Sequence, residues 1–391
     1  MSRAPRWLVV LTLAVLAGPA AAEPLRLRGD ALASAASPVG LLVLSGDGGL
    51  AHDGLHTVSA EAMVWLGADA DGVTGDALVM ALIARRQDGR AQVRVGRTVV
   101  TAGALRPVHL DGVAGRVRLP RRIDVELFGG VPAVPKLGAH AWDWVIGGRA
   151  ARRLGDSGSA GLALLEQRSQ GRLDTRELGL DAAVARGRRD LATRLAIDLI
   201  DPTVADVSVV ATQRWSAIRA EVSAQHRVPS HLLPATSLFT VLGDVASDRL
   251  GGGLRWKAAP RLDLVGDLGV RRIDGATAAD GFARATLRLD DAGRGAITGE
   301  ARRAGAIDGG WTGLRLAARV PRGALTASLE AELVIADVDR GRGRVWPWAL
   351  AALGWACGPW DAAVAVEASA SPAERGRLDV LGQLGRRWEL R

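Results

Sequence analysis

Most of the chain alternates hydrophobic and polar side chains with a period of two residues, and the stretch from Arg90 to Gly129 shows this most plainly. Val93 and Val95 alternate with polar residues there, and the alternation resumes in 113–119 and again in 123–127. Successive side chains of a β-strand point to opposite faces, so each segment is predicted to be a strand with one apolar and one charged face. The pattern indicates antiparallel strands rather than helices.

The same alternation continues along the chain and is most regular toward the C-terminus, and no segment has the period of a convincing amphipathic helix. Asp-Gly dipeptides punctuate it, and because Asp-Gly tolerates the positive φ of tight hairpins, we predict turns there. Their aspartates are residues 47, 53, 71, 88, 111, 274, 280 and 308. Further strands are predicted at 25–28, 39–44, 57–66, 77–84, 191–199, 218–225, 262–271, 283–290, 314–320, 325–333, 360–369 and 378–390.

The first 22 residues have the features of a secretory signal peptide. Arg3 and Arg6 form a basic start, an apolar run follows over 7–17, and Ala20-Ala21-Ala22 resembles a cleavage site. The run is shorter than the ~20 apolar residues of a membrane-spanning helix. We therefore predict a signal peptide over 1–22 and a single domain over 23–391, exported from the cytoplasm.

One apolar stretch does not alternate. Residues 227–247 contain Pro229 and Pro234, which break the pattern. We interpret the stretch as a loop, with the alternative that it folds inward and narrows whatever the strands enclose.

Two features favour a membrane barrel over a soluble sandwich, which would also have one polar and one apolar face. The apolar faces use Ala, Val, Leu and Gly with only three Phe in the chain, which suits contact with lipid better than sheet-on-sheet packing. Several tryptophans also lie near strand ends, as in an interfacial girdle, unless they belong to a sandwich core. They are Trp142, Trp144, Trp311, Trp346, Trp348 and Trp360.

Two segments resemble porin-type outer-membrane barrels of Gram-negative bacteria. One is Gly96-Arg97 followed by Asp111-Gly112, and the other is the alternating final segment 378–390 with Trp388 near its end. The resemblance implies an all-β fold, a single transmembrane antiparallel β-barrel in the cell outer membrane, whose last strand is recognised by the barrel-assembly machinery. The family's usual final aromatic is displaced here by Leu390 and Arg391. At ~9–11 residues a strand, roughly 16–22 strands fit, in an even number.

The charge balance leaves two interpretations open. The chain has 50 Lys and Arg against 42 Asp and Glu, a formal charge of +8, and removing Arg3 and Arg6 leaves 48 − 42 = +6. This surplus either attracts an anionic partner or simply reflects an arginine-rich composition. The charges form no tail or stripe, which excludes nucleic acid as the expected partner. The single cysteine, Cys357, cannot form an internal disulfide.

Three motifs that could carry chemistry lack their required context. Gly46–Ala51 matches a dinucleotide-binding glycine pattern but opens no helix, so we interpret it as a glycine-rich hairpin. Gly155–Gly158 is similar to a serine-protease nucleophile segment but lacks the upstream triad partners, so a turn before strand 160–166 is predicted. His52 and His56 lack a third metal ligand.

Among proteins that the barrel resembles are outer-membrane phospholipases, in which an Asn orients the Ser–His pair. The chain has no Asn. No Ser–His spacing stands out in the sequence. We therefore predict a protein that is not an enzyme, with no catalytic residue, cofactor or metal.

The resemblance implies a porin-like channel for passive diffusion of small hydrophilic solutes, surrounded by outer-membrane lipid. An arginine surplus on the polar faces predicts a mild preference for anions. The alternatives are a structural or assembly barrel that conducts nothing, and a soluble exported β-sandwich or propeller that binds a ligand. The candidate pore-lining residues are Arg94, Arg116, Arg118, Asp124, Glu126, Arg194, Arg219, Glu221, Asp263, Arg284, Arg288, Arg315, Arg319, Glu330 and Glu332.

Overall fold

The computed structural model describes the larger part of the chain, from Leu25 to Leu390 with gaps. The predicted signal peptide and most of the 227–247 stretch lie outside the described residues, as do Trp142 and Arg391. The described ranges are 25–34, 39–52, 55–69, 72–133, 143–228, 246–273, 275–306, 309–339, 341, 343–371 and 376–390.

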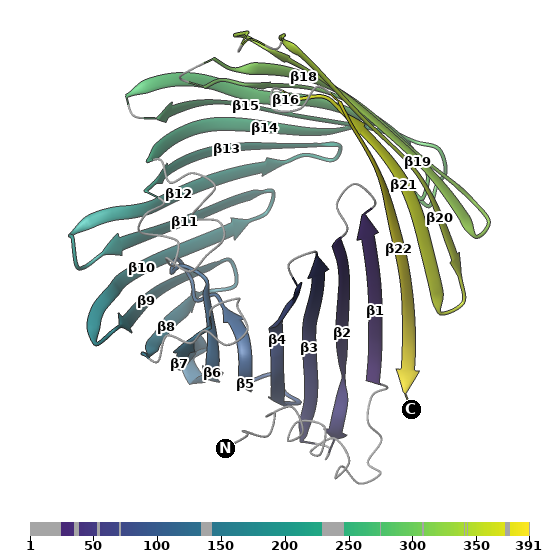
Figure 1. Cartoon of the computed structure of the whole chain (residues 1–391). Coiled ribbons are helices and arrows are strands. Elements are labelled where there is room, and N and C mark those ends of the chain that lie inside the picture. The colour runs from purple at the N-terminus through teal and green to yellow at the C-terminus, as the bar shows by residue number, and fades with distance from the viewer. Residues whose placement is uncertain are drawn as a thin grey trace.

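The described residues form 22 β-strands and one 3-10 turn at Pro120–Arg122 (Figure 1). The strands are β1 (Leu25–Ser34), β2 (Val39–His52), β3 (His56–Asp69), β4 (Gly72–Arg86), β5 (Ala91–Val100), β6 (Val108–Leu119), β7 (Ile123–Pro132), β8 (Val145–Leu154), β9 (Gly158–Ser169), β10 (Arg172–Arg186), β11 (Arg189–Asp198), β12 (Thr203–Arg214), β13 (Ile218–Arg227), β14 (Ser247–Ala259), β15 (Leu262–Ile273), β16 (Ala276–Arg288), β17 (Ala296–Ala304), β18 (Trp311–Arg322), β19 (Leu325–Ala336), β20 (Val345–Cys357), β21 (Trp360–Ser369) and β22 (Arg377–Leu390).

The strands close into one antiparallel barrel. Each strand pairs with the next along the chain, and β1 pairs with β22 in a ladder that runs from Leu25 opposite Leu390 to Ser34 opposite Leu381. Pairing of β1 with β22 removes the two free edges that an open sheet would have. The predicted all-β antiparallel barrel is confirmed, with a strand number at the upper end of the expected range.

In the described part of the chain, no helix has the length and apolar character needed to cross a membrane.

The connections at the two ends of the barrel differ in length. At the end where β1 begins and β22 ends, most turns are short, such as 323–324 and 358–359, and the longest is 289–295. At the opposite end several are longer, such as 337–344 between β19 and β20. Outer-membrane barrels have short periplasmic turns and longer extracellular loops. The end where β1 begins and β22 ends therefore resembles a periplasmic rim.

The Asp-Gly rule succeeds at Asp88, where a turn joins β4 to β5, but it is wrong at Asp47, Asp111 and Asp280. These three lie inside β2, β6 and β16, and their glycines are paired within ladders. The glycine-rich segment 46–49 is therefore strand and not a hairpin turn. Ladder hydrogen bonds on both sides of a strand override a local preference for a turn.

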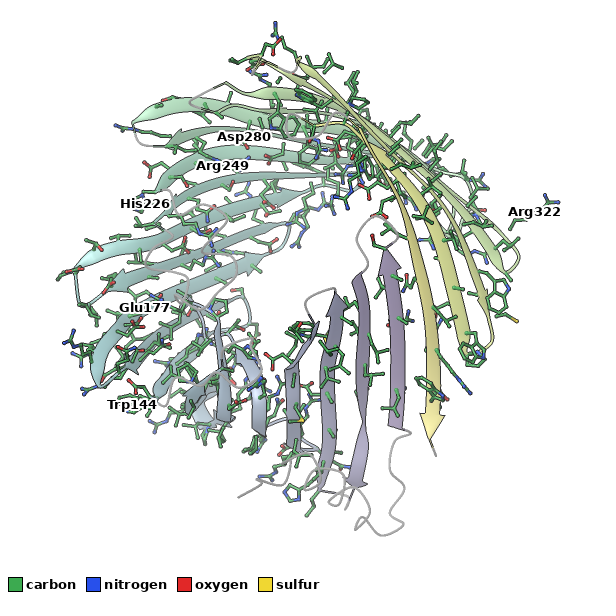
Figure 2. The ribbon with its side chains drawn as sticks, in the orientation of Figure 1. Trp144, Glu177, His226, Arg249, Asp280 and Arg322 are labelled. Carbon is green, nitrogen blue, oxygen red and sulfur yellow. The ribbon has the colours of Figure 1, made fainter. Side chains whose placement is uncertain are left out.

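Large apolar side chains cover the outer face. Leu268 is 75% exposed, Leu250 62% and Val222 59%, values that a soluble sheet packed on another layer would not allow. Figure 2 shows side chains along the whole wall, with Arg322 projecting away from the barrel near a turn.

Three of the tryptophans assigned to an interfacial girdle are on the other face. Cross-strand partners share a face, and Trp348 pairs with Glu332 and donates a hydrogen bond to Glu367 (2.8 Å) on the charged side of the wall. Trp346 is two residues from Trp348, and Trp311 is four residues from Arg315, so both lie on the same charged face. The girdle prediction is therefore wrong for these three, because their side chains lie on the charged inner face, where Trp348 bonds to Glu367 and Trp311 stacks with Arg302.

Candidate functional site

All fifteen candidate residues lie on one face of the barrel wall. Pairing places Glu126 opposite Arg149, and each following ladder continues the same face around the barrel to Glu300, Arg315 and Glu332. The opposite face carries the exposed leucines and valines. The charged side chains therefore face the interior of the barrel, and their role in lining a conducting path stays a prediction.

Most of these charges are paired with an opposite charge on the same face. Among the fifteen, Arg319 is the one for which the described residues include no ion pair. Such half-exposed pairs each contribute little to stability, about 0–1 kcal/mol, but they neutralise the wall locally. The pairs are Arg94–Glu61 (3.2 Å), Arg116–Glu126 (4.0 Å), Arg118–Asp124 (3.2 Å), Arg194–Asp206 (3.1 Å), Arg219–Glu221 (3.1 Å), Arg288–Asp263 (2.8 Å), Arg315–Glu330 (2.7 Å), Arg284–Glu300 and Arg302–Glu332.

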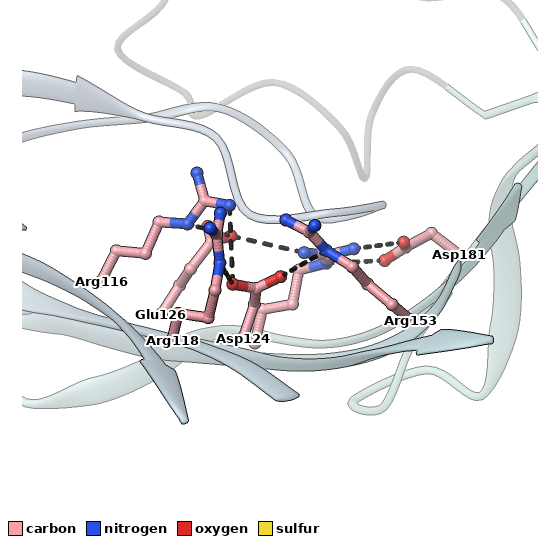
Figure 3. A network of polar contacts seen from close by, with 7 residues as sticks. Arg116, Arg118, Asp124, Glu126, Arg153 and Asp181 are labelled. Atoms are coloured by element: carbon pink, nitrogen blue, oxygen red, sulfur yellow. Dashed lines mark hydrogen bonds and ion pairs between the residues drawn. The ribbon is translucent and has the colours of Figure 1, made fainter. Parts of the chain in front are cut away.

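Asp124 is the centre of the densest network (Figure 3). It lies 3.2 Å from Arg118, 3.5 Å from Arg153 and 3.8 Å from Arg116, so three guanidinium groups from β6 and β8 surround one carboxylate. The Asp124 side chain is 10% exposed and the arginines are about half exposed. This cluster has a local excess of positive charge directed toward the interior.

A fourth arginine, Arg149, continues the network toward β10. Arg149 donates two hydrogen bonds to Asp181 (2.9 and 2.6 Å) and one to Glu126 (3.3 Å). A side chain at Gly161 would collide with this pair, since its Cβ would lie 2.8 Å from an Asp181 oxygen. The glycine therefore makes room for a two-pronged ion pair across three strands.

The β5–β6 hairpin leaves the wall and bends inward. Backbone pairing between β4 and β5 ends at Met80 and Arg97, although β4 continues back to Gly72. Gly96, at φ +126, stands at the bend, and a Cβ there would lie 2.2 Å from the Met80 carbonyl oxygen. A glycine is required at this position because both the φ angle and the close approach exclude other residues.

Side chains replace the backbone hydrogen bonds that β4 loses at the bend. Arg97 donates to Asp76 (2.6 Å) and to Asp111 (2.7 and 2.8 Å), and Asp76 is 3% exposed. His109 Nε2 lies 2.8 Å from the Leu78 carbonyl oxygen. Polar side chains therefore close the seam between β4 and the departing hairpin.

The tip of the hairpin, residues 101–107, contacts the inner face of β10. Arg106 donates to Glu177 (2.8 Å), and the two residues are 8% and 1% exposed. Gly179 lets the tip approach, since a Cβ there would lie 3.2 Å from Leu105. A buried ion pair with a close backbone contact fixes the tip against the wall.

A small apolar cluster fills the space under the tip. Its members come from the tip and from the inner faces of β6, β7, β8 and β9. Burying a large aliphatic or aromatic side chain contributes ~1.5–3 kcal/mol, so the cluster is a substantial anchor. It consists of Ala102, Leu105, Val108, Leu110, Phe128, Val145, Ala163 and Leu165.

Sequence reasoning missed this inward hairpin. It assigned the segment to ordinary strands and considered 227–247 as the segment that enters the interior, a stretch that lies mostly outside the described residues. A signal was present in the phase of the pattern. Leu110, Phe128 and Leu165 are large apolar residues at positions that the alternation assigns to the inner, otherwise polar face.

The described residues contain no group of three or more His, Cys, Asp or Glu side chains placed to hold a metal ion.

Comparison with known proteins rests on structure alone, because no protein-family model and no curated protein sequence matches the chain. A chain of the E. coli P pilus tip assembly intermediate PapC-PapD-PapK-PapG matches with a TM-score of 0.55 at 10% identity, covering 93% of this chain and 61% of that one. The ferric citrate transporter FecA matches with a TM-score of 0.54 at 9% identity, covering 94% and 78%. The fold is that of an outer-membrane barrel.

A further similar structure covers nearly the whole of both chains. Pseudomonas aeruginosa OccD3 covers 96% of this chain and 94% of its own, with a TM-score of 0.47 at 9% identity. At these identities the similarity concerns the fold alone. The large closed barrel and its outer-membrane neighbours agree with the predicted location in the outer membrane.

Proposed function

We propose that the protein is an outer-membrane channel for the passive diffusion of small hydrophilic solutes. The observation that carries the proposal is the opposition of the two faces: a closed barrel of 22 strands with exposed leucines outside and paired charges inside. Charges that faced lipid at mid-depth would cost ~2–4 kcal/mol each, whereas a hydrated interior tolerates them. A barrel of this strand number is wide enough for water unless something fills it.

Conductance in a planar bilayer tests the proposal. We expect the purified barrel to give stepwise ohmic currents. A variant in which residues 98–107 are replaced by a short Gly-Ser turn should give larger steps, because the hairpin tip takes up interior space beside β10. Absence of current from both proteins would contradict a channel function.

The inward hairpin also supports a second candidate, a structural or assembly barrel that does not conduct. A tip anchored by a buried ion pair and an apolar cluster is the kind of feature that could help fill an interior. Current from the hairpin-shortened variant alone, with none from the native chain, would favour this candidate.

A mild preference for anions belongs to the same proposal, and the pairing of charges makes it testable. Replacing Arg315 and Arg319 with Ala should shift the reversal potential in a salt gradient toward cations, because Glu330 then loses its partner. The matched control is Arg315→Ala with Glu330→Ala, which leaves the net charge unchanged and should shift it much less. An unchanged potential in the first variant would contradict anion preference.

A further inference from the structure

An arginine on the last strand is held between two tryptophan rings. The Cζ atom of Arg386 lies 4.5 Å from the ring centroid of Trp360 and 5.2 Å from that of Trp388. Arg386 is the cross-strand partner of Trp360, and Trp388 is two residues further along β22 on the same face. Both contacts are within the range of a cation–π interaction, so the guanidinium plane is fixed by its neighbours.

This cluster faces outward. Gly385, the residue before Arg386, points inward, because a Cβ there would lie 2.6 Å from Asp361 and 2.9 Å from Asp30, which both belong to the interior network. Leu384, on the same face as Arg386, is 50% exposed. Arg386 therefore lies on the surface that the barrel presents to its surroundings.

The cluster is also close to the rim. Trp360 is the first residue of β21 and directly follows the short turn at 358–359. Short turns mark the periplasmic side of outer-membrane barrels, and tryptophans collect where the hydrocarbon meets the headgroups. Arg386, opposite Trp360, is thus at the level of phospholipid headgroups rather than in the hydrocarbon.

The charge of Arg386 is not compensated by the protein. Its neighbour Arg387 points inward and lies 3.8 Å from Asp361, whereas Arg386 forms no ion pair with any residue that the structure describes. An arginine on a lipid-facing wall is costly unless an anion accompanies it. The surroundings offer such an anion in the phosphate of a phospholipid.

We propose that Trp360, Arg386 and Trp388 form a binding site for the phosphate of an anionic phospholipid headgroup in the periplasmic leaflet. The two rings hold the guanidinium, whose Nε atom is buried without a hydrogen-bond partner among the described residues, and its terminal N–H groups can donate to two phosphate oxygens. An acyl chain would then run along the exposed Leu384 and Leu44. The site rests on the proposed membrane location but not on conduction.

Native mass spectrometry of the detergent-solubilised barrel with added phosphatidylglycerol tests the site. Arg386→Gln should weaken the binding of the first lipid about tenfold, the loss expected for a charge-assisted hydrogen bond. Arg386→Lys keeps the charge without the two-pronged geometry and should bind with intermediate strength. The control is Arg272→Gln, which removes another outward-facing arginine at the far end of β15 and should leave binding unchanged.

Equal binding by the native chain and Arg386→Gln would overturn the site, as would displacement of the lipid by inorganic phosphate at the same concentration. A heat-dependent shift in gel mobility confirms that each variant is a folded barrel before binding is compared. Because Arg386 faces outward, Arg386→Gln should conduct as the native chain does. A barrel that binds the lipid but carries no current would contradict the channel and leave this site standing.

Discussion

Gly96 shows how one residue determines where the wall ends and the inward hairpin begins. Its neighbours in β5 follow the alternation that predicts a strand, and the alternation gives no sign of a bend. The bend depends on a φ of +126 and on the closeness of the Met80 carbonyl, neither of which appears in a hydrophobic pattern. Backbone conformation of this kind is therefore missed by period-two reasoning.

Gly96→Ala should destabilise the barrel by ~1–3 kcal/mol from strain at positive φ alone. The added Cβ would also lie only 2.2 Å from the Met80 carbonyl oxygen, which increases the loss. The measurement is the midpoint of urea unfolding in detergent. Gly382→Ala is the matched control, since a Cβ there meets nothing within 4 Å, and its midpoint should hardly change. Equal midpoints for the two variants would mean that the bend does not depend on the glycine.

At the scale of the element, most strands were predictable and the hairpin tip was not. Alternation located the strands because one face meets apolar surroundings and the other meets water, so the polarity of each residue indicates its face. The docking of residues 101–107 on β10 depends on contacts between segments about 70 positions apart, such as Arg106 with Glu177. The interior positions of Trp311 and Trp348 were likewise hidden, because a tryptophan suits either a lipid interface or a polar partner.

The ion pair at the hairpin tip gives a further expectation. Arg106→Ala leaves the Glu177 carboxylate buried without its partner and should cost about 3–5 kcal/mol of unfolding free energy. Replacing both residues by Leu should recover much of the loss, because neither charge of the pair is then left buried without its partner. A double-mutant cycle in urea measures this, and additive effects of the two single changes would contradict direct coupling.

The connection between β19 and β20 should respond to acid. Asp337, just beyond β19, accepts hydrogen bonds from Arg303 (2.6 Å) and from the Gly310 backbone (2.9 Å), and these lower its pKa below the ordinary 3.8. The stabilisation is complete above the ordinary pKa and is lost as the pH falls through the lowered one. We expect hydrogen exchange at Gly310 to rise, relative to its intrinsic rate, below about pH 4. Asp337→Asn should abolish this dependence.

At the scale of the whole molecule, closure through β1 and β22 determines the behaviour in detergent. Unboiled protein should migrate faster on a denaturing gel than boiled protein, because a closed barrel without free edges resists unfolding by the detergent. The expectation applies to protein recovered from the outer-membrane fraction. Identical mobility, with the protein soluble in the periplasm, would contradict the membrane barrel.

The neighbour-to-neighbour pairing of all strands has a consequence for the order of the chain. Because β22 pairs with β1, every strand has an antiparallel neighbour on each side. The pairing alone therefore does not identify a first or a last strand. A gene in which the ends of β22 and β1 are joined by a linker, and new ends are opened at the 323–324 turn, should encode the same barrel. Such circular permutants would show whether the barrel needs only its strand pairing or also needs β22 to be the last strand synthesised.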